Sequence, residues 1–303
     1  MDFFILVFVF IFGTIIGSFL NVVIYRYNSG TSPLTGRSHC FSCGKTLSWR
    51  ELFPLISFLV ARGRCVKCSV RLSWQYPIVE VLSGVIFVAV FLLEKPVPET
   101  MFLLAIFSTL LVIAVYDLRH QIIPDGLAVF FAVASLGWFF WSIPGGYREA
   151  FRFPYYWTLI AGPMLFFPFW ALWFVSKGRW IGLGDGKLAL GIGWFLGATL
   201  GGSAVMLAFW IGAAYALAIM AFQRIAIIAS AYASQKSKVL KSKVGAPALL
   251  STLWTFDFMD LKDSRLSMQS EIPFGPFLIL AVFIVYFTGI NFFDGSVNFF
   301  SFL

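Results

Sequence analysis

The chain alternates long apolar runs with short polar segments, and this pattern predicts membrane helices rather than a soluble core. A helix needs roughly 17–25 residues, most of them apolar, to cross a bilayer. The runs that approach this length are residues 3–25, 76–93, 99–116, 127–143, 157–175, 187–200, 203–222 and 273–290. We therefore expect an all-α polytopic membrane protein with about eight transmembrane helices.

Two of these runs have features of their own. The run at 187–200 is short and contains Gly191, Gly193 and Gly197, which lower helix propensity but let neighbouring backbones approach closely. This composition favours a buried central helix. The first run, 3–25, is longer than the apolar part of a signal peptide, and no Lys or Arg precedes it. We expect it to be a retained anchor.

Composition supports the membrane class and explains the basic charge. Hydrophobic residues make up 60% of the chain and charged residues 12%, far from the balance of soluble domains. If the loops after the first, third, fifth and seventh runs face the cytosol, that side holds every basic residue except Lys95, Arg148 and Arg152. The net charge of +8 then follows from topology, so we expect no nucleic-acid partner. The lysines at 236–243 indicate a solvated loop or a contact with anionic membrane lipid.

Two polar stretches divide the chain into domains. Residues 1–26 form the first transmembrane helix, and residues 27–75 form a small cytosolic insert that contains all four cysteines. Residues 76–303 form a membrane domain with the other seven helices and a cytosolic loop at about 223–272. Within that loop, residues 246–258 are apolar enough to lie on the membrane surface.

The cysteines form two CxxC pairs, which is the pattern of a tetrahedral zinc site. The gap between the pairs is just past the usual range of zinc ribbons, and a reducing cytosol disfavours disulfides. A site with four cysteine ligands is closed, so this zinc would be structural rather than hydrolytic. The alternative is two redox pairs without a metal. The predicted ligands are Cys40, Cys43, Cys65 and Cys68.

Two aspartates at the predicted cytosolic edge are candidates for catalysis. Asp117 directly follows the third run and Asp185 precedes the sixth. Two carboxylates in close contact share a proton, which leaves one as a base and one as an acid for activating water on a peptide carbonyl. Each also has a structural alternative: Asp117 would pair with Arg119, and Asp185 would stabilise a helix N-terminus.

The residues around the aspartates favour the functional interpretation. Gly182 and Gly184 precede Asp185 and give a backbone on which a substrate strand can lie closely. They do not form a dinucleotide-binding motif, because no strand precedes them and the third glycine is missing. For Asp125, after Pro124, we expect helix capping rather than catalysis. Glu80, near the start of the second run, has a similar dipole explanation.

These motifs, taken in order, resemble those of the type IV prepilin peptidase family in its longer form with N-methyltransferase activity. The resemblance covers nearly the whole chain. Its motifs are Gly17-Ser-Phe-Leu-Asn21, the two CxxC pairs with Gly63-Arg64-Cys65, Tyr76-Pro-Ile-Val-Glu80, Asp117, Ile123-Pro124-Asp125, Gly182-x-Gly184-Asp185 and Ile272-Pro-Phe-Gly-Pro276.

The resemblance implies an activity, a location and roles for residues. It implies a multi-pass enzyme of the bacterial inner membrane that cleaves prepilin or pseudopilin leaders on the cytosolic side. It also implies methylation of the new N-terminus, with S-adenosylmethionine as donor. Asp117 and Asp185 would be the catalytic pair, and the four cysteines would bind zinc. The residues expected at the methyl-donor site are Gly63, Arg64 and Glu80.

Three alternatives to this dual activity remain at the level of sequence. The first is a peptidase without methyl transfer, since no soluble S-adenosylmethionine-binding fold is visible. The second is a transporter that uses Asp117, Asp125 and Asp185 as a cation relay. Its acids would be expected near the membrane midplane, whereas these acids cluster at one edge. The third is a scaffold protein that binds other pilus components through its zinc domain.

Overall fold

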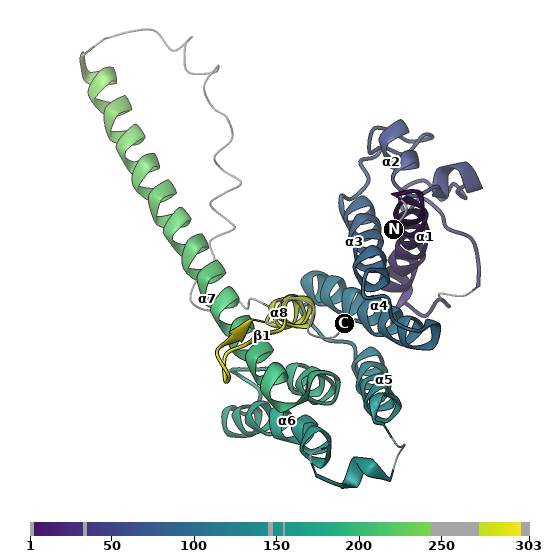
Figure 1. The fold of residues 1–303 in the computed structure, drawn as a ribbon. Helices are drawn as coiled ribbons and strands as arrows, with labels where there is room; N and C mark the ends of the chain where they lie inside the picture. Colours follow the sequence, from purple (N-terminus) through teal and green to yellow (C-terminus); the bar gives the residue numbers. More distant parts are fainter. Residues whose placement is uncertain (1–2, 33–34, 145–147, 154, 244–272, 298–303) are drawn as a thin grey trace. The chain divides into compact units, whose positions relative to one another are not determined.

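The computed structural model describes residues 3–32, 35–144, 148–153, 155–243 and 273–297, and these are mostly helical (Figure 1). The long helices are α1 (Phe3–Arg26), α3 (Gln75–Phe91), α4 (Val97–His120), α5 (Asp125–Ser142), α6 (Tyr156–Ser176), α7 (Leu183–Lys243) and α8 (Gly275–Thr288). The short elements are η1 (Trp49–Leu52), α2 (Ile56–Val60), η2 (Glu149–Phe151) and an antiparallel hairpin of β1 (Ile290–Asn291) and β2 (Ser296–Val297).

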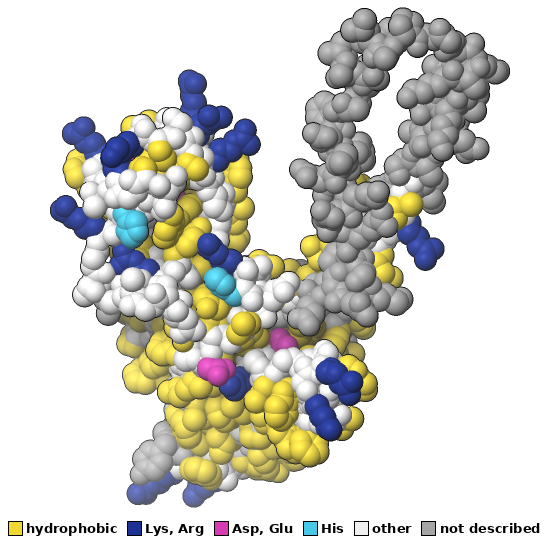
Figure 2. All heavy atoms as spheres, turned by 180° about the vertical axis from the view of Figure 1, so that it is seen from behind, with side chains coloured by type: hydrophobic (Ala, Val, Ile, Leu, Met, Phe, Trp, Pro, Cys, Tyr) yellow, Lys and Arg dark blue, Asp and Glu magenta, His cyan; other side chains and the backbone are white. Residues whose placement is uncertain are grey.

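The predicted class, an all-α polytopic membrane protein, is confirmed. Within the described residues, five helices are long and apolar enough to cross a membrane, namely α1, α4, α5, α6 and the first part of α7. Two shorter apolar helices, α3 and α8, occupy two further predicted spans. Figure 2 shows hydrophobic side chains over much of the visible surface, as expected where lipid is the solvent. Phe4, for example, is 82% exposed.

Helix α7 joins the sixth and seventh predicted spans, and its boundaries differ from our expectation. We placed the break at about 200–203, but the only residue of this helix with a reported non-helical conformation is Gly197, with φ 79° and ψ −175°. The helix also continues past residue 222 to Lys243, through a segment rich in alanine and lysine, which are strong helix formers. The rest of the predicted loop, including 246–258, lies outside the described residues.

The chain divides into two compact units, one of residues 1–208 and 273–303, and the other of residues 209–272. The first unit contains both aspartates, all four cysteines and most of the packing. The described part of the second unit is the helical segment 209–243.

Close packing of α1 against α3 depends on small residues. A Cβ atom added at Gly13 would lie 2.8 Å from the Cα of Gly84, and one added at Gly17 would lie 2.8 Å from the Cα of Glu80. Apolar burial drives association weakly inside a bilayer, so dispersion between closely approaching backbones supplies much of the stability. The two glycines therefore set the position of Glu80 against α1.

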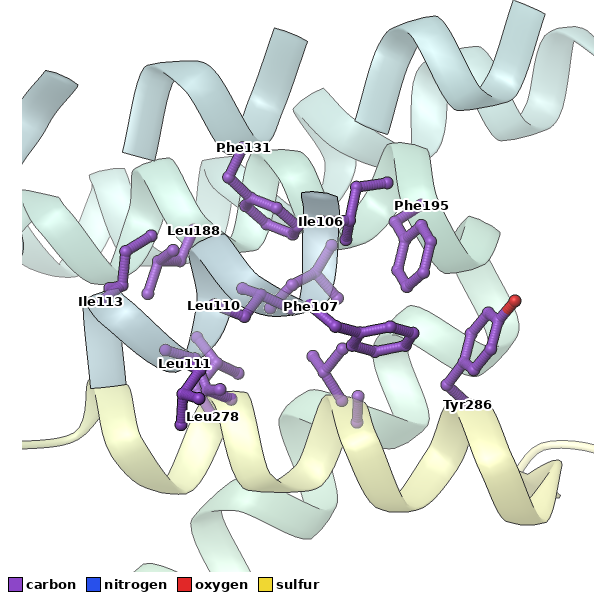
Figure 3. Close-up of a cluster of buried hydrophobic side chains, with 14 of the residues drawn as sticks. Ile106, Phe107, Leu110, Leu111, Ile113, Phe131, Leu188, Phe195, Leu278 and Tyr286 are labelled. Carbon is purple, nitrogen blue, oxygen red and sulfur yellow. The ribbon is translucent and has the colours of Figure 1, made fainter. Parts of the chain in front are cut away.

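The core of the first unit forms around α4, α8 and the start of α7. Phe107 of α4 is fully buried, and its ring packs edge-on against Phe195 of α7 and Tyr286 of α8, with centroids 5.7 and 5.1 Å away (Figure 3). Leu110 and Leu188 continue this cluster toward the ends of α4 and α7 that carry the aspartates. The core thus fixes the helices that position the candidate site.

Candidate active site and metal centre

Asp117 lies at the end of α4 and is held by the start of α8. Its side chain is buried, and α4 ends three residues later at His120. The next residue, Gln121, takes a left-handed conformation, and its N–H donates to the Asp117 carbonyl oxygen over 2.7 Å. The backbone of Gly275 makes a hydrogen bond to the Asp117 carboxylate. A Cβ atom at Gly275 would lie 2.5 Å from Asp117 Oδ2. Only glycine therefore fits at position 275 without displacing the carboxylate.

Asp185 lies in the first turn of α7 and is also buried. Its carboxylate accepts a hydrogen bond from the backbone of Gly182, which satisfies a donor just before the helix. A Cβ atom at Gly184 would lie 2.8 Å from the Cβ of Ile123, so bare backbone is needed there as well. The Gly182-x-Gly184 step thus positions Asp185 and brings the chain close to the α4–α5 turn.

The fold brings the two aspartates together. The Asp117 carboxylate acts electrostatically on Asp185, although 68 positions of sequence separate them. Ile123 forms a wall common to both, since its side chain faces Gly184 and would lie 3.2 Å from a Cβ at Gly275. A buried pair of carboxylates, each bonded by a glycine backbone, is an arrangement suited to acid–base chemistry on a bound peptide.

The ion-pair alternative for Asp117 receives no support within the described residues, whereas Asp185 does lie in the first turn of α7, where a carboxylate favours the helix N-terminus. Neither Asp117 nor Asp185 forms an ion pair among the salt bridges found there. Arg119 is the alternative partner of Asp117. Its guanidinium instead lies over the Tyr25 ring, 4.1 Å from the ring centroid. Both acids lie at the ends of their helices, which does not fit the midplane relay of a transporter.

The capping role that we expected for Asp125 is wrong. Pro124 occupies the N-cap of α5, and Asp125 is the first helical residue, with no side-chain cap. Its carboxylate instead pairs with Lys187 of α7 over 2.5 Å. The reason is tertiary: packing of α5 against α7 brings a cation within reach, which local sequence does not reveal.

A cavity lined in part by Tyr116 was not predicted from the sequence. It has a volume of about 280 Å³ and is formed by the end of α1 and the α4–α5 turn. Tyr27 and Tyr116 form part of its wall, with Asp125 at its edge. No local signal could have indicated it, because α1 and α4 are far apart in sequence. The lining residues are Tyr27, Asn28, Tyr116, Ile122, Ile123, Pro124, Asp125 and Gly126.

The four cysteines converge on one point. Their sulfur atoms all lie within 4.8 Å of one another, and Cys40–Cys68 and Cys43–Cys65 are separated by 3.9 and 4.0 Å. Tetrahedral zinc with bonds of about 2.3 Å would place its sulfur ligands about 3.8 Å apart. The sulfurs are too far apart for disulfides, and all four cysteines are free. The geometry therefore fits zinc and disfavours oxidised redox pairs.

Each CxxC pair forms a tight turn of the same kind. The N–H of Gly44 donates to the Cys40 carbonyl over 2.9 Å, and the N–H of Ser69 donates to the Cys65 carbonyl over 2.8 Å. Gly44 and Ser69, each directly after a second cysteine, both have positive φ. The two turns thus present their sulfurs in the same way, as two halves of one site.

The environment of the sulfurs favours thiolate at two positions before any metal binds. Backbone N–H groups of Cys43 and Ser42 lower the pKa of Cys40, and those of Cys68 and Lys67 lower the pKa of Cys65 to about 6. The Lys45 backbone also acts to lower the pKa of Cys43, but burial and the other thiols outweigh it and raise that pKa to about 11. A metal would need to displace the protons that remain.

The three residues expected at a methyl-donor site lie in and beside the insert. Gly63 has φ +65° and follows α2, and Arg64 begins the second cysteine turn. Glu80 is buried in α3, where its carboxylate accepts the N–H of Leu55 over 2.8 Å and a hydrogen bond from Ser18. The hydrogen-bond partners of Glu80 thus come from the insert and from α1.

Comparison with known proteins gives matches along both parts of the chain. The family model of the bacterial peptidase A24 N-terminal domain matches residues 11–93, which include the insert. The model of the type IV leader peptidase family matches residues 104–217, which include both aspartates. No solved structure gives a significant match to the chain.

Relatives with curated names agree with these models. A prepilin leader peptidase/N-methyltransferase of Myxococcus xanthus is 32% identical over 194 residues, covering 63% of this chain and 56% of the relative. One of Klebsiella pneumoniae is 31% identical over 201 residues, covering 63% of this chain and 84% of the relative. One of Xanthomonas campestris is 26% identical over 311 residues, covering 95% and 92%. Because these matches include the insert and both buried aspartates, the chain belongs to the type IV leader peptidase family.

Proposed function

We propose that the chain cleaves the leader peptide of a type IV prepilin or pseudopilin and methylates the new N-terminus. The cleavage site would face the cytosol from the bacterial inner membrane. The observation that carries the proposal is the buried pair of Asp117 and Asp185, each bonded by the backbone of a glycine. The relatives' names supply the substrate class and the second activity.

In the proposed cleavage, the aspartates act as one unit. They share a proton, because two carboxylates in contact do not both ionise. The ionised one takes a proton from a water molecule whose oxygen bonds to the scissile carbonyl carbon, and the protonated one donates its proton to the carbonyl oxygen. The carbon–nitrogen bond then breaks as the leaving amine takes a proton back from the pair. Gly275 packs against the Asp117 carboxylate and Gly184 against Ile123, and the lack of a side chain at both positions lets the two helix ends approach and hold the pair in place.

Methyl transfer is the second part of the proposal, and the insert is the part of the chain that supports it. S-adenosylmethionine would supply an electrophilic methyl group to the new amine. Gly63 offers a bare backbone in a left-handed conformation, and the guanidinium of Arg64 suits the donor's carboxylate. We assign these two residues to holding the donor. The four cysteines would bind zinc, which stabilises the insert.

Mass spectrometry of a prepilin incubated with the purified protein tests both parts. Loss of the leader is expected without added donor, and a methyl increment on the product is expected only with S-adenosylmethionine. Leader loss without any methyl increment would show that the protein is a peptidase without methyltransferase activity. If the prepilin stays intact after incubation with folded, zinc-loaded protein, the proposal is overturned.

A further inference from the structure

The insert contains a strained turn directly before α2. Leu55 has φ 58° and ψ −51°, and the N–H of Ile56 donates to the Pro54 carbonyl over 2.5 Å. This is a γ-turn of the rare type, in which a residue with a side chain is forced to positive φ. Such a conformation persists only where surrounding groups fix it.

The group that fixes this turn is Glu80. Its carboxylate accepts the Leu55 N–H over 2.8 Å, and Ser18 of α1 bonds the same side chain. Glu80 is only 7% exposed and lies where Gly17 lets α1 approach α3. The bond is partly buried, and an N–H that loses its acceptor there costs free energy, so this bond ties the strained turn to the membrane helices.

The γ-turn at Leu55 affects the position of Gly63 and Arg64 through α2. Helix α2 begins at Ile56, and its Phe58 carbonyl accepts the Gly63 N–H over 2.9 Å. The Phe58 ring is buried, 5.2 Å from the Trp74 ring, and its Cζ would lie 3.1 Å from a Cβ at Gly63. A series of hydrogen bonds and chain connections therefore links Glu80, through the γ-turn and α2, to Gly63 and Arg64, the residues that we assign to the methyl donor.

We propose that Glu80 is a positioning residue, which orients Gly63 and Arg64 by accepting the Leu55 N–H, and not a ligand of the methyl donor. This inference rests on the proposed methyl transfer. It replaces the expectation from resemblance that Glu80 binds the donor. Because the role is that of an acceptor, a neutral side chain of the same shape fills it: the oxygen of glutamine can accept the Leu55 N–H, whereas alanine offers no acceptor.

Full-length Glu80→Gln, Glu80→Ala and wild-type proteins are compared in three measurements. The first is methylation of a synthetic peptide that already has a free N-terminus, so that cleavage is not needed. The second is the rate at which trypsin cuts the insert, which contains Arg62, Arg64 and Arg71. The third is zinc content, with leader cleavage as a check of the membrane domain. Glu99→Ala, at the far end of α4, is the matched carboxylate control.

The expected pattern is rescue by glutamine. Glu80→Gln should methylate within about twofold of wild type, while Glu80→Ala should lose about tenfold, the scale of a partly buried donor left without its acceptor. Leader cleavage and zinc content should stay near wild type in both. Trypsin should cut the insert faster in Glu80→Ala alone, and Glu99→Ala should match wild type throughout.

Two results would overturn the inference. One is loss of methylation in Glu80→Gln, which would show that the carboxylate charge itself is used. The other is wild-type methylation and trypsin resistance in Glu80→Ala. If the wild-type protein methylates nothing, the methyl-transfer part of the proposed function fails, and trypsin still decides the positioning role. Faster cutting in Glu80→Ala than in Glu80→Gln supports it, and equal rates overturn it.

Discussion

The membrane core and the cysteine insert hold their functional residues by different physical means. In the core, helices packed through glycines and a buried aromatic cluster fix Asp117 and Asp185 at adjoining helix ends. In the insert, two short turns and a five-residue helix bury few residues, so four sulfurs must supply the fixed point. We therefore expect the membrane core to lose its function when its packing is changed, and the insert to lose its fold when the metal is removed.

The largest effect is expected at the aspartates. Asp117→Asn and Asp185→Asn should each reduce leader cleavage by at least about a thousandfold, because members of a catalytic unit fail together. The double variant should be no worse than either single one. Mass spectrometry of the prepilin measures this, with zinc content as the control for folding. Near wild-type cleavage in either single variant would contradict the pair, and methylation of a prepilin by these variants is not expected.

The next effect concerns the metal. Serine at any one of the four cysteine positions should abolish zinc binding and unfold the insert, since binding free energy is folding free energy in such units. Methylation should be lost, whereas cleavage should survive in part, because the aspartates lie in the membrane core. Elemental analysis and cleavage assays on the same preparations check this. Wild-type protein purified without chelator and lacking zinc would contradict the assignment.

Substitution of Gly63 or Arg64, the residues assigned to the methyl donor, should separate methylation from cleavage. Gly63→Ala forces a side chain into the left-handed region, at about 1–2 kcal/mol, and presses it on Phe58. We expect cleaved but largely unmethylated product, and the same for Arg64→Ala. Gly30→Ala is the matched control, because Gly30 has φ +76° and a Cβ there would meet nothing within 4 Å. Normal methylation in both variants would make the insert purely structural.

A smaller and opposite effect is expected at Gly275. A methyl group there would displace the Asp117 carboxylate, so Gly275→Ala should slow cleavage by about tenfold to a hundredfold, the scale of a misplaced catalytic group. Methylation of a peptide with a free N-terminus should be unchanged. Gly137→Ala is the control, since its Cβ would make only an ordinary 3.7 Å contact with Phe102. Equal cleavage by both variants would be evidence against this packing.

The smallest effect is expected at the Lys45–Glu51 ion pair of the insert. Lys45 lies 2.6 Å from Glu51 and, with the Ser48 N–H, lowers the pKa of Glu51 to about 2. The pair therefore stabilises the insert above the ordinary pKa of glutamate and is lost as pH falls toward 2. At neutral pH, Lys45→Met should speed zinc release to a chelator by less than about threefold, as expected for a solvated pair. A Lys67→Met variant is the control, and loss of zinc in Lys45→Met would show a larger role.

Much of the candidate site could be predicted because its motifs are local. The two CxxC pairs indicate a metal site by residue type and spacing, and the Gly182-x-Gly184-Asp185 motif indicates an acid at the start of a helix. Asp125 shows where local reasoning fails, since its partner Lys187 lies 62 residues away. Glu80 is a second case: its place near the start of the second run suggested a dipole role and the resemblance suggested a donor ligand, and neither indicated its bond to the N–H of Leu55, 25 residues away.

The sequence by itself determined the class of the protein, because bilayer thickness sets the length of an apolar run and thiolate chemistry sets the spacing of a metal site. It also indicated that Asp117 and Asp185 lie at helix ends. Only the tertiary structure decided which groups meet there. Ile123 between Gly184 and Gly275, the cavity between α1 and the α4–α5 turn, and the bond from Glu80 to Leu55 all join distant segments. Such contacts depend on how helices pack, and the periodicity of one helix does not specify the neighbour that it will face.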